Sequence, residues 1–482
     1  MRAITVGLLV IVISVLAGLV CWASEHDRPL EFPRAFYATM VVMQGAMFIL
    51  WTLSECGQAI SRERELKTYD FLKTTRLTSA ELLVGKLLGA PVLAYFALAC
   101  SLPISVVAGL MAGLRPTAIL WTYLLMLVVG LFWSLVGLFL SMTTEKTGVN
   151  PAVLGLVLIF PIMGMAMLFL ETAFPGLAAI SVAPAVQELY GEAVRAAPSP
   201  SFFGLRVSYQ FLSVFLHATF GAWIVLMLIR NLKKDLEQIR LLSRWGAVGF
   251  VIFLNVLLYA LLDPKRIRSG AFPGMITEGE ISTIAVILNA VIIFAVGVAT
   301  LTPAEKLKVW WRRGAAAGAS WFAGDAPPWP WLLVAAMSAY FLLAVEAAAL
   351  SGIISFRQWP LGSAAVQLLT FLIFAVRDVL FLQWCLLTRM KRQVLKGFLF
   401  LCLYYTAALI VGAVVQRVSE PAGRLAITLL TPFLVFDMHA NRLGLWGGLG
   451  GMALQIGMIL FMLRAIVGRL ERPAGAAAAA VA

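Results

Sequence analysis

Long apolar runs, separated by short polar stretches, recur along the whole chain. A helix that crosses a bilayer needs about 20 apolar residues, and twelve segments meet this requirement. We predict spanning helices at 3–23, 35–56, 87–111, 117–141, 152–170, 207–229, 246–262, 281–301, 331–350, 362–383, 397–416 and 444–467. The pattern predicts an all-α, polytopic integral membrane protein with about twelve transmembrane helices.

Composition agrees with this pattern. Of the 482 residues, 61% are hydrophobic and 13% are charged, and the mean hydropathy is +0.93. Soluble domains are about 45–50% apolar and about 25% charged. A soluble enzyme is therefore excluded, and the lipid bilayer is the expected environment.

The formal net charge of +13 is interpreted as membrane topology. Lys and Arg gather on the cytoplasmic loops of membrane proteins. When alternate loops are compared, the side that holds both termini carries twice as many Lys and Arg residues as the other side. We therefore expect both termini in the cytoplasm and no nucleic-acid partner. The expected location is a bacterial inner (plasma) membrane.

Metal and redox chemistry have little support in the sequence. The five cysteines are scattered without a C-x-x-C pair, and the three histidines (His26, His217 and His439) lie far apart. Structural metal sites need closely spaced Cys and His ligands. We expect no metal ligands and no catalytic residues in this chain.

The polar stretch 57–86, between the second and third predicted spans, is dense in charge. Leu66, Tyr69 and Leu72 recur at helical spacing and predict one amphipathic helix, in which Glu63 and Lys67 form an i,i+4 ion pair. Positive-inside charges on a solvated interfacial loop explain the same pattern, so both interpretations stay open here.

A second helix is predicted after this amphipathic segment. Thr78 is followed three residues later by Glu81, which is the pattern of a capping box. We expect a helix to begin near Ser79 and to run into the third span. The two helices then form a rigid helix–turn–helix that protrudes into the cytoplasm.

This stretch resembles the cytoplasmic signature of ABC-2-type transporter permeases. The common signature has Gly where this chain has Lys67, and often Pro where it has Arg76. The positions that carry the resemblance are Arg62, Glu63, Arg64, Glu65, Lys67, Thr68, Asp70, Phe71, Leu72, Thr75, Arg76, Leu77, Thr78, Glu81, Gly85 and Lys86. All of them except Phe71 and Thr75 are candidate site residues.

The resemblance implies the permease subunit of an ATP-binding cassette exporter. The loop would act as a coupling helix that docks in a groove of a separate ATPase (nucleotide-binding) subunit. The sequence has no G-x-x-x-x-G-K-[ST] motif, so we expect ATP and Mg²⁺ in that partner, no cofactor on this chain and no enzyme activity of its own. A second permease copy or a paralogue is the other expected partner.

Two membrane regions are predicted. Residues 1–235 form a six-helix, permease-like region that includes loop 57–86, and residues 236–482 form a second six-helix region with a short cytoplasmic tail. The second region is a possible degenerate repeat of the first, because the basic segment 301–313 follows the eighth span as loop 57–86 follows the second.

Ionisable residues inside predicted spans are costly and are functional candidates by default. Glu346 lies late in the ninth span, and Arg377 and Asp378 lie in the inner part of the tenth. The interpretation that we favour ends the tenth span early and places Arg377 and Asp378 in an interfacial helix.

Two other function classes remain as alternatives. A secondary, ion-coupled transporter would use carboxylates near the middle of the bilayer. A membrane-embedded transferase would need an acidic or histidine cluster at the interface, where Glu171, Glu188, Glu192, Glu278 and Glu280 are thinly spread. The sequence does not identify the transported substrate.

Overall fold

A computed structural model of the chain is mostly helical. It describes residues 2–24, 32–143, 200–235, 241–261, 304–317, 333–338, 361–388, 393–419 and 442–471, with single residues or short pieces at 179, 239, 292–294, 296–298, 301–302, 331, 422, 426 and 429–431.

Apolar helices of spanning length support the predicted class of helical membrane protein. Within the described residues, six are long and apolar enough to cross a membrane: Phe32–Glu65, Val92–Met111, Pro116–Thr143, Tyr209–Asn231, Leu399–Arg417 and Leu449–Leu470. The predicted spans at 152–170, 281–301 and 331–350 lie wholly or mostly outside the described residues. The number twelve and the cytoplasmic placement of both termini therefore stay predictions.

The chain divides into two compact units, which are described separately. Unit 1 consists of Met1–Ile239 with Leu261–Asp263, and unit 2 consists of Arg240–Ala260 with Pro264–Ala482.

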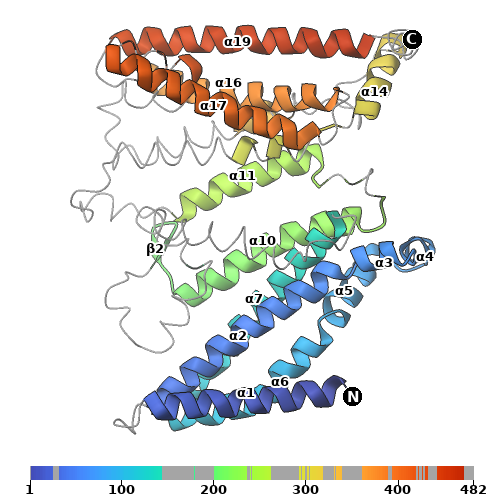
Figure 1. Cartoon of the computed structure of the whole chain (residues 1–482), viewed down its shortest axis with the longest axis vertical. Helices are drawn as coiled ribbons and strands as arrows, with labels where there is room; N and C mark the ends of the chain where they lie inside the picture. Colours follow the sequence, from blue (N-terminus) through green and yellow to red (C-terminus); the bar gives the residue numbers. More distant parts are fainter. Residues whose placement is uncertain are drawn as a thin grey trace. The chain divides into compact units, whose positions relative to one another are not determined.

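Unit 1 is a helical bundle with one small hairpin (Figure 1). Helix α2 packs against α6 and α7, helix α10 packs against α7, and α1 lies on α2 and α6. The elements are α1 (Arg2–Ser24), α2 (Phe32–Gln58), α3 (Ser61–Glu65), α4 (Tyr69–Thr74), α5 (Ser79–Gly89), α6 (Val92–Met111), α7 (Pro116–Thr143), β1 (Ser201–Phe202), β2 (Leu205–Arg206) and α10 (Tyr209–Asn231).

Helices α2 and α7 approach each other closely at two glycines of α7. A Cβ atom on Gly130 would lie 2.0 Å from the Phe48 ring, and one on Gly137 would lie 2.8 Å from the Leu53 carbonyl oxygen. The two glycines are seven residues apart and therefore share one face of α7. Small residues of this kind let helix backbones pack tightly in membranes.

A buried polar cluster also joins helices α2, α6 and α7. The Gln44 side-chain amide donates to the Ser101 carbonyl and to the Ser105 hydroxyl, each at 3.2 Å, and the Tyr123 hydroxyl donates to Gln44 Oε1 at 2.9 Å. Hydrogen bonds between helices are one of the forces that hold membrane bundles together.

The third predicted span differs from the expectation. Helix α5 ends at Gly89, Ala90 donates its amide to the Lys86 carbonyl at 3.0 Å, and α6 begins at Val92. Pro91 lies between the two helices and has no amide hydrogen to continue the bonding pattern. The prediction of one continuous helix from Ser79 into the third span is therefore wrong.

Unit 2 contains α11 (Arg244–Leu261, apart from its last residue), α14 (Ala304–Ala317), α16 (Leu361–Leu386), α17 (Gln393–Val418) and α19 (Arg442–Glu471). Helix α16 packs against both α17 and α19, and α14 also contacts α19. Leu307 and Trp310 of the basic helix α14 are buried in the core of this unit.

Candidate functional site

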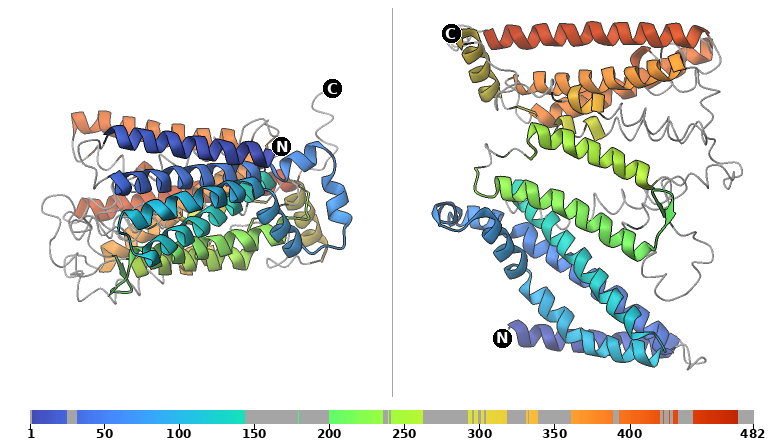
Figure 2. Two further views of the ribbon diagram at one scale, coloured as in Figure 1. Left: turned by 90° about the horizontal axis from the view of Figure 1, so that it is seen from below. Right: turned by 180° about the vertical axis from the view of Figure 1, so that it is seen from behind.

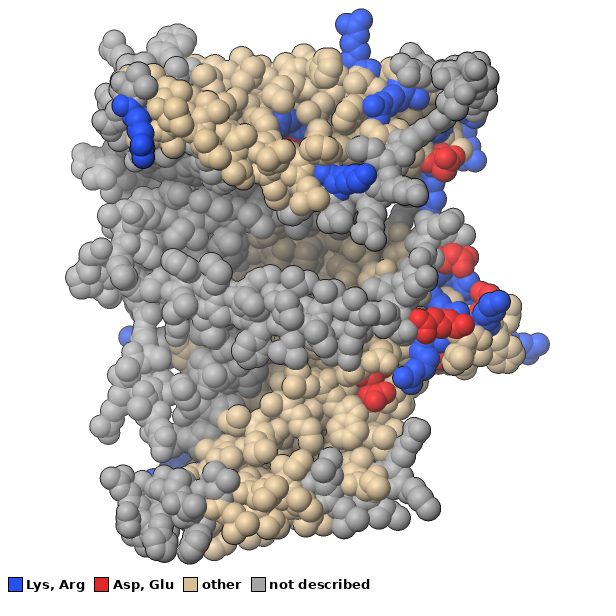
Figure 3. Space-filling model, in the orientation of Figure 1, with Lys and Arg blue, Asp and Glu red and all other residues tan. Residues whose placement is uncertain are grey.

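Loop 57–86 protrudes from one end of the unit 1 helices, and α3 and α4 lie at its far end (Figures 1 and 2). The space-filling view shows acidic and basic side chains gathered on this protrusion, while the described surface of the neighbouring helices carries few charges on that face (Figure 3). The loop is thus the most polar part of the visible surface of unit 1.

The loop contains two short helices rather than one amphipathic helix. Helix α3 ends at Glu65, and Lys67 has a φ of 57°, in the left-handed region. The Thr68 amide donates to the Glu63 carbonyl at 2.9 Å, and the Lys67 amide donates to the Arg64 carbonyl at 3.1 Å. These two bonds form a Schellman motif, which ends a helix. The prediction of a single helix through Leu66, Tyr69 and Leu72 is therefore wrong.

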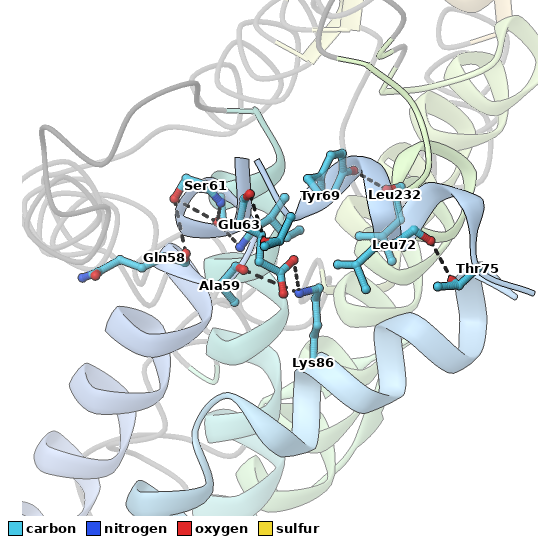
Figure 4. A network of polar contacts seen from close by, with 12 residues as sticks. Gln58, Ala59, Ser61, Glu63, Tyr69, Leu72, Thr75, Lys86 and Leu232 are labelled. Carbon is cyan, nitrogen blue, oxygen red and sulfur yellow. Dashed lines mark hydrogen bonds and ion pairs between the residues drawn. The ribbon is translucent and has the colours of Figure 1, made fainter. Parts of the chain in front are cut away.

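An ion pair joins the two ends of the loop. Lys86 Nζ of α5 lies 2.6 Å from Glu63 Oε2 of α3, and it also donates to the Ala59 carbonyl oxygen at 3.5 Å (Figure 4). The Lys86 and Glu63 side chains are only 11% and 29% exposed. Glu63 therefore pairs with Lys86, and the predicted i,i+4 pair with Lys67 is wrong because Lys67 follows the helix end.

Helix α3 is also bonded to the end of α7. The Ser141 hydroxyl oxygen accepts from the backbone amides of Ile60 at 2.9 Å and Ser61 at 3.0 Å. The first amides of a helix have no partner within the helix, so Ser141 caps α3 from a distant part of the sequence. Arg64 adds a hydrogen bond from Nη1 to the Met142 carbonyl at 2.8 Å.

Helix α4 is bonded to the end of α10. The buried Tyr69 hydroxyl donates to the Leu232 carbonyl, as Figure 4 shows, and Lys73 pairs with Asp235. Burial raises the pKa of Tyr69. Hydrogen bonds from the Lys73 ammonium to Asp235 and then to Asp70 raise the pKa of Lys73. Both groups keep their protonated, hydrogen-bond-donating forms at neutral pH.

The capping box at the start of α5 is confirmed. Thr78 Oγ1 accepts from the Glu81 amide at 3.2 Å, and Glu81 Oε2 accepts from the Thr78 amide at 2.7 Å. The hydrogen bond from the Thr78 backbone lowers the pKa of Glu81, and the Thr78 hydroxyl lowers it further. Helix α5 begins at Ser79, as predicted.

The outward side of the loop combines apolar and charged residues. Leu66 is 67% exposed, Phe71 is 73% exposed and Leu77 is 46% exposed. The exposed polar and charged residues of the same loop are Arg62, Glu65, Lys67, Thr68, Asp70, Thr74, Arg76, Thr78 and Glu81. Large apolar side chains exposed among charges are a feature of surfaces that bind proteins.

The predicted site residues therefore divide into three groups. Glu63, Arg64 and Lys86 brace the loop against the helices, and Thr68, Thr78 and Glu81 form its local turns and caps. The others lie on the surface, except Leu72, which is half-buried. Gly85 is exposed, with open space around its missing Cβ atom.

Sequence reasoning missed the partners that brace the loop, and it left the exposed Phe71 out of the candidate site residues although Phe71 belongs to the signature. Ser141 and Asp235 come from segments far along the chain, and no local pattern points to them. Phe71 stands next to Leu72 in the signature, and helical spacing directed attention to Leu72, the less exposed of the two.

The second predicted set concerns charges inside spans. Glu346 lies outside the described residues. Arg377 and Asp378 are 2% and 6% exposed, and both lie within α16, which continues to Leu386. The helix therefore continues through the pair without a break, and both side chains are buried inside unit 2; their position relative to the membrane interface stays a prediction.

Arg377 is held by a complete set of partners. Its Nε donates to Asp378 at 2.8 Å and its Nη2 donates to Asp378 and, at 2.9 Å, to Tyr405. Its Nη1 donates to the Tyr404 hydroxyl at 3.1 Å and to Gln455 Oε1 at 2.7 Å. An arginine has five N–H donors, and these five bonds occupy all of them.

Asp378 is held equally firmly, because its second carboxylate oxygen accepts from the Tyr405 hydroxyl at 2.5 Å. This arrangement leaves no Arg377 donor for an anionic substrate. It favours a structural role for the pair over direct participation in transport.

Within the described residues, no group of three or more His, Cys, Asp and Glu side chains is arranged to hold a metal ion. Comparison with known proteins adds no further constraint: no protein-family model, curated protein or solved structure matches this chain.

Proposed function

We propose that this chain is the membrane permease subunit of an ABC-2-type ATP-binding cassette exporter. Loop 57–86 couples it to a separate ATPase subunit that binds ATP and Mg²⁺. The export direction and the ATPase partner rest on the resemblance of the loop to the ABC-2 signature. The proposal places the protein in a bacterial inner membrane, where a second permease copy or a paralogue completes the pore.

One observation carries the proposal: the loop is braced on its inner side and presents apolar side chains on its outer side. Leu66 and Phe71 are 67% and 73% exposed, although they lie beside a firmly bonded framework. An exposed aromatic among charged residues is a typical anchor of a protein interface. We assign Phe71 and Leu66 as the anchors for the ATPase, with Arg62, Glu65 and Arg76 around them.

The bracing explains how movement of the ATPase would reach the membrane. Ser141 and Met142 bind α3 to α7, Leu232 and Asp235 bind α4 to α10, and the Glu63–Lys86 pair binds α3 to α5. A docked loop held in this way transmits force to three helices as one body, and rigid-body movement of this kind is a common mode of conformational coupling.

Affinity purification from detergent extract tests the proposal. We expect an ATPase subunit to co-purify with the wild type. Phe71→Ala should weaken this association by about thirtyfold, because truncation of an interface anchor costs about 2 kcal/mol or more. Substitution of Glu63 and Arg64 is less informative, because both residues also brace the loop internally.

Leu205→Ser is the matched control. Leu205 of β2 is 70% exposed and lies outside the loop, so this change should leave ATPase recovery unchanged. Absence of an ATPase from the wild-type purification contradicts the proposed function. Equal recovery with Phe71→Ala contradicts the assignment of the anchor.

A further inference from the structure

Two side chains of unit 2 reach the same short backbone segment from different helices. The Tyr404 hydroxyl of α17 donates to the Leu430 carbonyl at 2.8 Å. The Gln455 side-chain amide of α19 donates to the Leu429 carbonyl at 3.0 Å. Residues 429–431 belong to the connection between these two helices, so this part of the connection lies beside positions that are well inside both helices.

The depth of this contact follows from helix geometry. Tyr404 lies fourteen residues before the end of α17 at Val418, and Gln455 lies thirteen residues after the start of α19 at Arg442. At a rise of 1.5 Å per residue, both positions are about 20 Å from the helix ends that the connection joins. The apolar layer of a bilayer is about 30 Å thick, so a segment at this level lies well inside it.

Backbone at this depth needs hydrogen-bond partners from the protein, because lipid supplies none. Tyr404 and Gln455 supply them, and Arg377 holds both side chains through its Nη1 atom. The Arg377 guanidinium also lies over the Tyr404 ring, 4.7 Å from the ring centre. The buried ion pair of α16 therefore orients the two donors that bind the segment.

Packing agrees with these polar contacts. Thr431 is fully buried. A Cβ atom placed on Gly450 of α19 would lie 3.4 Å from Leu429 Cδ2. Leu429 therefore packs against α19 at a position that has no side chain. Helix α16 packs on both α17 and α19 (Figure 1), and its Arg377 bonds to Tyr404 of α17 and to Gln455 of α19.

We propose that residues 429–431, which belong to the connection between α17 and α19, lie inside the membrane, and that Arg377 is the positioning residue that keeps them there. Arg377 acts through Tyr404 and Gln455 and does not bind the transported substrate. This inference depends on unit 2 alone and needs no ATPase partner, so it can fail or succeed independently of the proposed function.

Cysteine labelling in sealed membrane vesicles tests the proposal. A membrane-impermeant maleimide is applied to Thr431→Cys and to Gln416→Cys, an exposed position near the end of α17, and the wild type with its five native cysteines gives the blank. We expect Gln416→Cys to react when the reagent is on its own side of the membrane, and Thr431→Cys to stay protected whichever side carries the reagent.

Release of the segment should then expose it. Tyr404→Phe combined with Gln455→Leu removes both hydrogen bonds, and labelling of Thr431→Cys should become about tenfold faster or more. The control Thr406→Val, on the same helix, removes a hydroxyl that bonds only to its own helix at Cys402 and should leave labelling unchanged. Labelling of Thr431→Cys as fast as Gln416→Cys in the otherwise unmodified protein would overturn the proposal.

Cross-linking provides a second measurement that does not depend on reagent access. Cysteines in place of Leu429 and Gly450 should be joined by a short bifunctional thiol reagent, and Arg377→Gln should lower the yield of this product. Absence of any cross-link in the folded protein contradicts the predicted position of the segment.

Discussion

The Glu63 carboxylate meets the Lys86 ammonium at 2.6 Å and thereby joins the first helix of loop 57–86 to the helix that ends the loop. The two residues stand at opposite ends of the stretch that resembles the ABC-2 signature. Their pairing explains why an acidic residue at one end and a Gly-Lys pair at the other belong to one structural unit. We infer that this pair keeps α3 and α5 together while the outer surface of the loop is free to bind.

Removal of either charge should loosen the loop. The pair is partly shielded from water, so we expect Glu63→Gln or Lys86→Met to lower the free energy of unfolding by about 1 kcal/mol. This value lies between those for exposed and buried ion pairs. The double variant should cost less than the sum of the two. Thermal unfolding and limited proteolysis measure the effect, and Arg76→Gln, which removes an exposed cation of the same loop, is the control. Strict additivity of the two substitutions contradicts a direct interaction.

Lys67 occupies a backbone conformation that favours glycine. Its φ of 57° costs a residue with a side chain about 1 kcal/mol relative to glycine. Lys67→Gly should therefore stabilise the loop by about this amount and slow hydrogen exchange of the Thr68 amide, whereas Lys67→Val should destabilise it. Equal stability of the Gly and Val variants is the result that would rule out this explanation.

Gly137 should tolerate no larger side chain. A Cβ atom there would lie 2.8 Å from a backbone oxygen of α2, which cannot move away easily, and crowding of this kind costs about 1–3 kcal/mol. Gly137→Ala should lower the melting temperature in detergent. Gly45→Ala is the matched control in the same pair of helices, because its Cβ would meet only Met126 Cε at an ordinary 3.6 Å. A melting temperature unchanged by Gly137→Ala contradicts the close approach.

The capping box predicts a loss of order in acid. The pKa of Glu81 is lowered in the folded loop. The stabilisation that its carboxylate gives to the start of α5 is therefore fully present above the pKa of a glutamate in the unfolded chain, about 4.3. The contribution disappears as the pH falls through the lower, folded-state pKa. We expect the first amides of α5 to lose protection from hydrogen exchange in that range, after correction for intrinsic rates. Glu81→Gln should remove the acid transition, and its persistence would assign the transition to another group.

Lys73 gives the opposite dependence at high pH. Its pKa is raised by hydrogen bonds to Asp235 and Asp70. The stabilisation that the Lys73 ammonium gives to the contact between α4 and α10 is therefore fully present below the pKa of a lysine in the unfolded chain, about 10.4. It is lost as the pH rises through the higher, folded-state value. The attachment of α4 to α10 should therefore stay unchanged from neutral pH up to about pH 9. Lys73→Met should weaken it at neutral pH, as measured by proteolysis after Leu232.

Several features followed from the sequence because their causes are local. Apolar runs of spanning length predicted the helical membrane class, since the bilayer sets the required length. The Thr78–Glu81 capping box predicted the start of α5, since both partners lie within one helical turn. The position of the polar loop between two apolar helices followed from the same pattern.

Other features depended on partners that the sequence does not place together. Helical spacing predicted one helix in the loop, but the backbone turns at Lys67 and the Ser141 hydroxyl caps α3 from eighty residues away. Pro91 was visible in the sequence, yet its apolar surroundings masked the break between α5 and α6.

The sequence by itself determined that the chain is a helical membrane protein with one conspicuous polar loop, because hydropathy and capping act over a few residues. Only the tertiary structure decided which residues of that loop brace it and which face outward. It also decided that the hydrogen-bond donors of Arg377 are all occupied inside the protein, because its partners Tyr404 and Gln455 come from two other helices. Burial and ion pairing are set by neighbours in space, and a single sequence does not specify these neighbours.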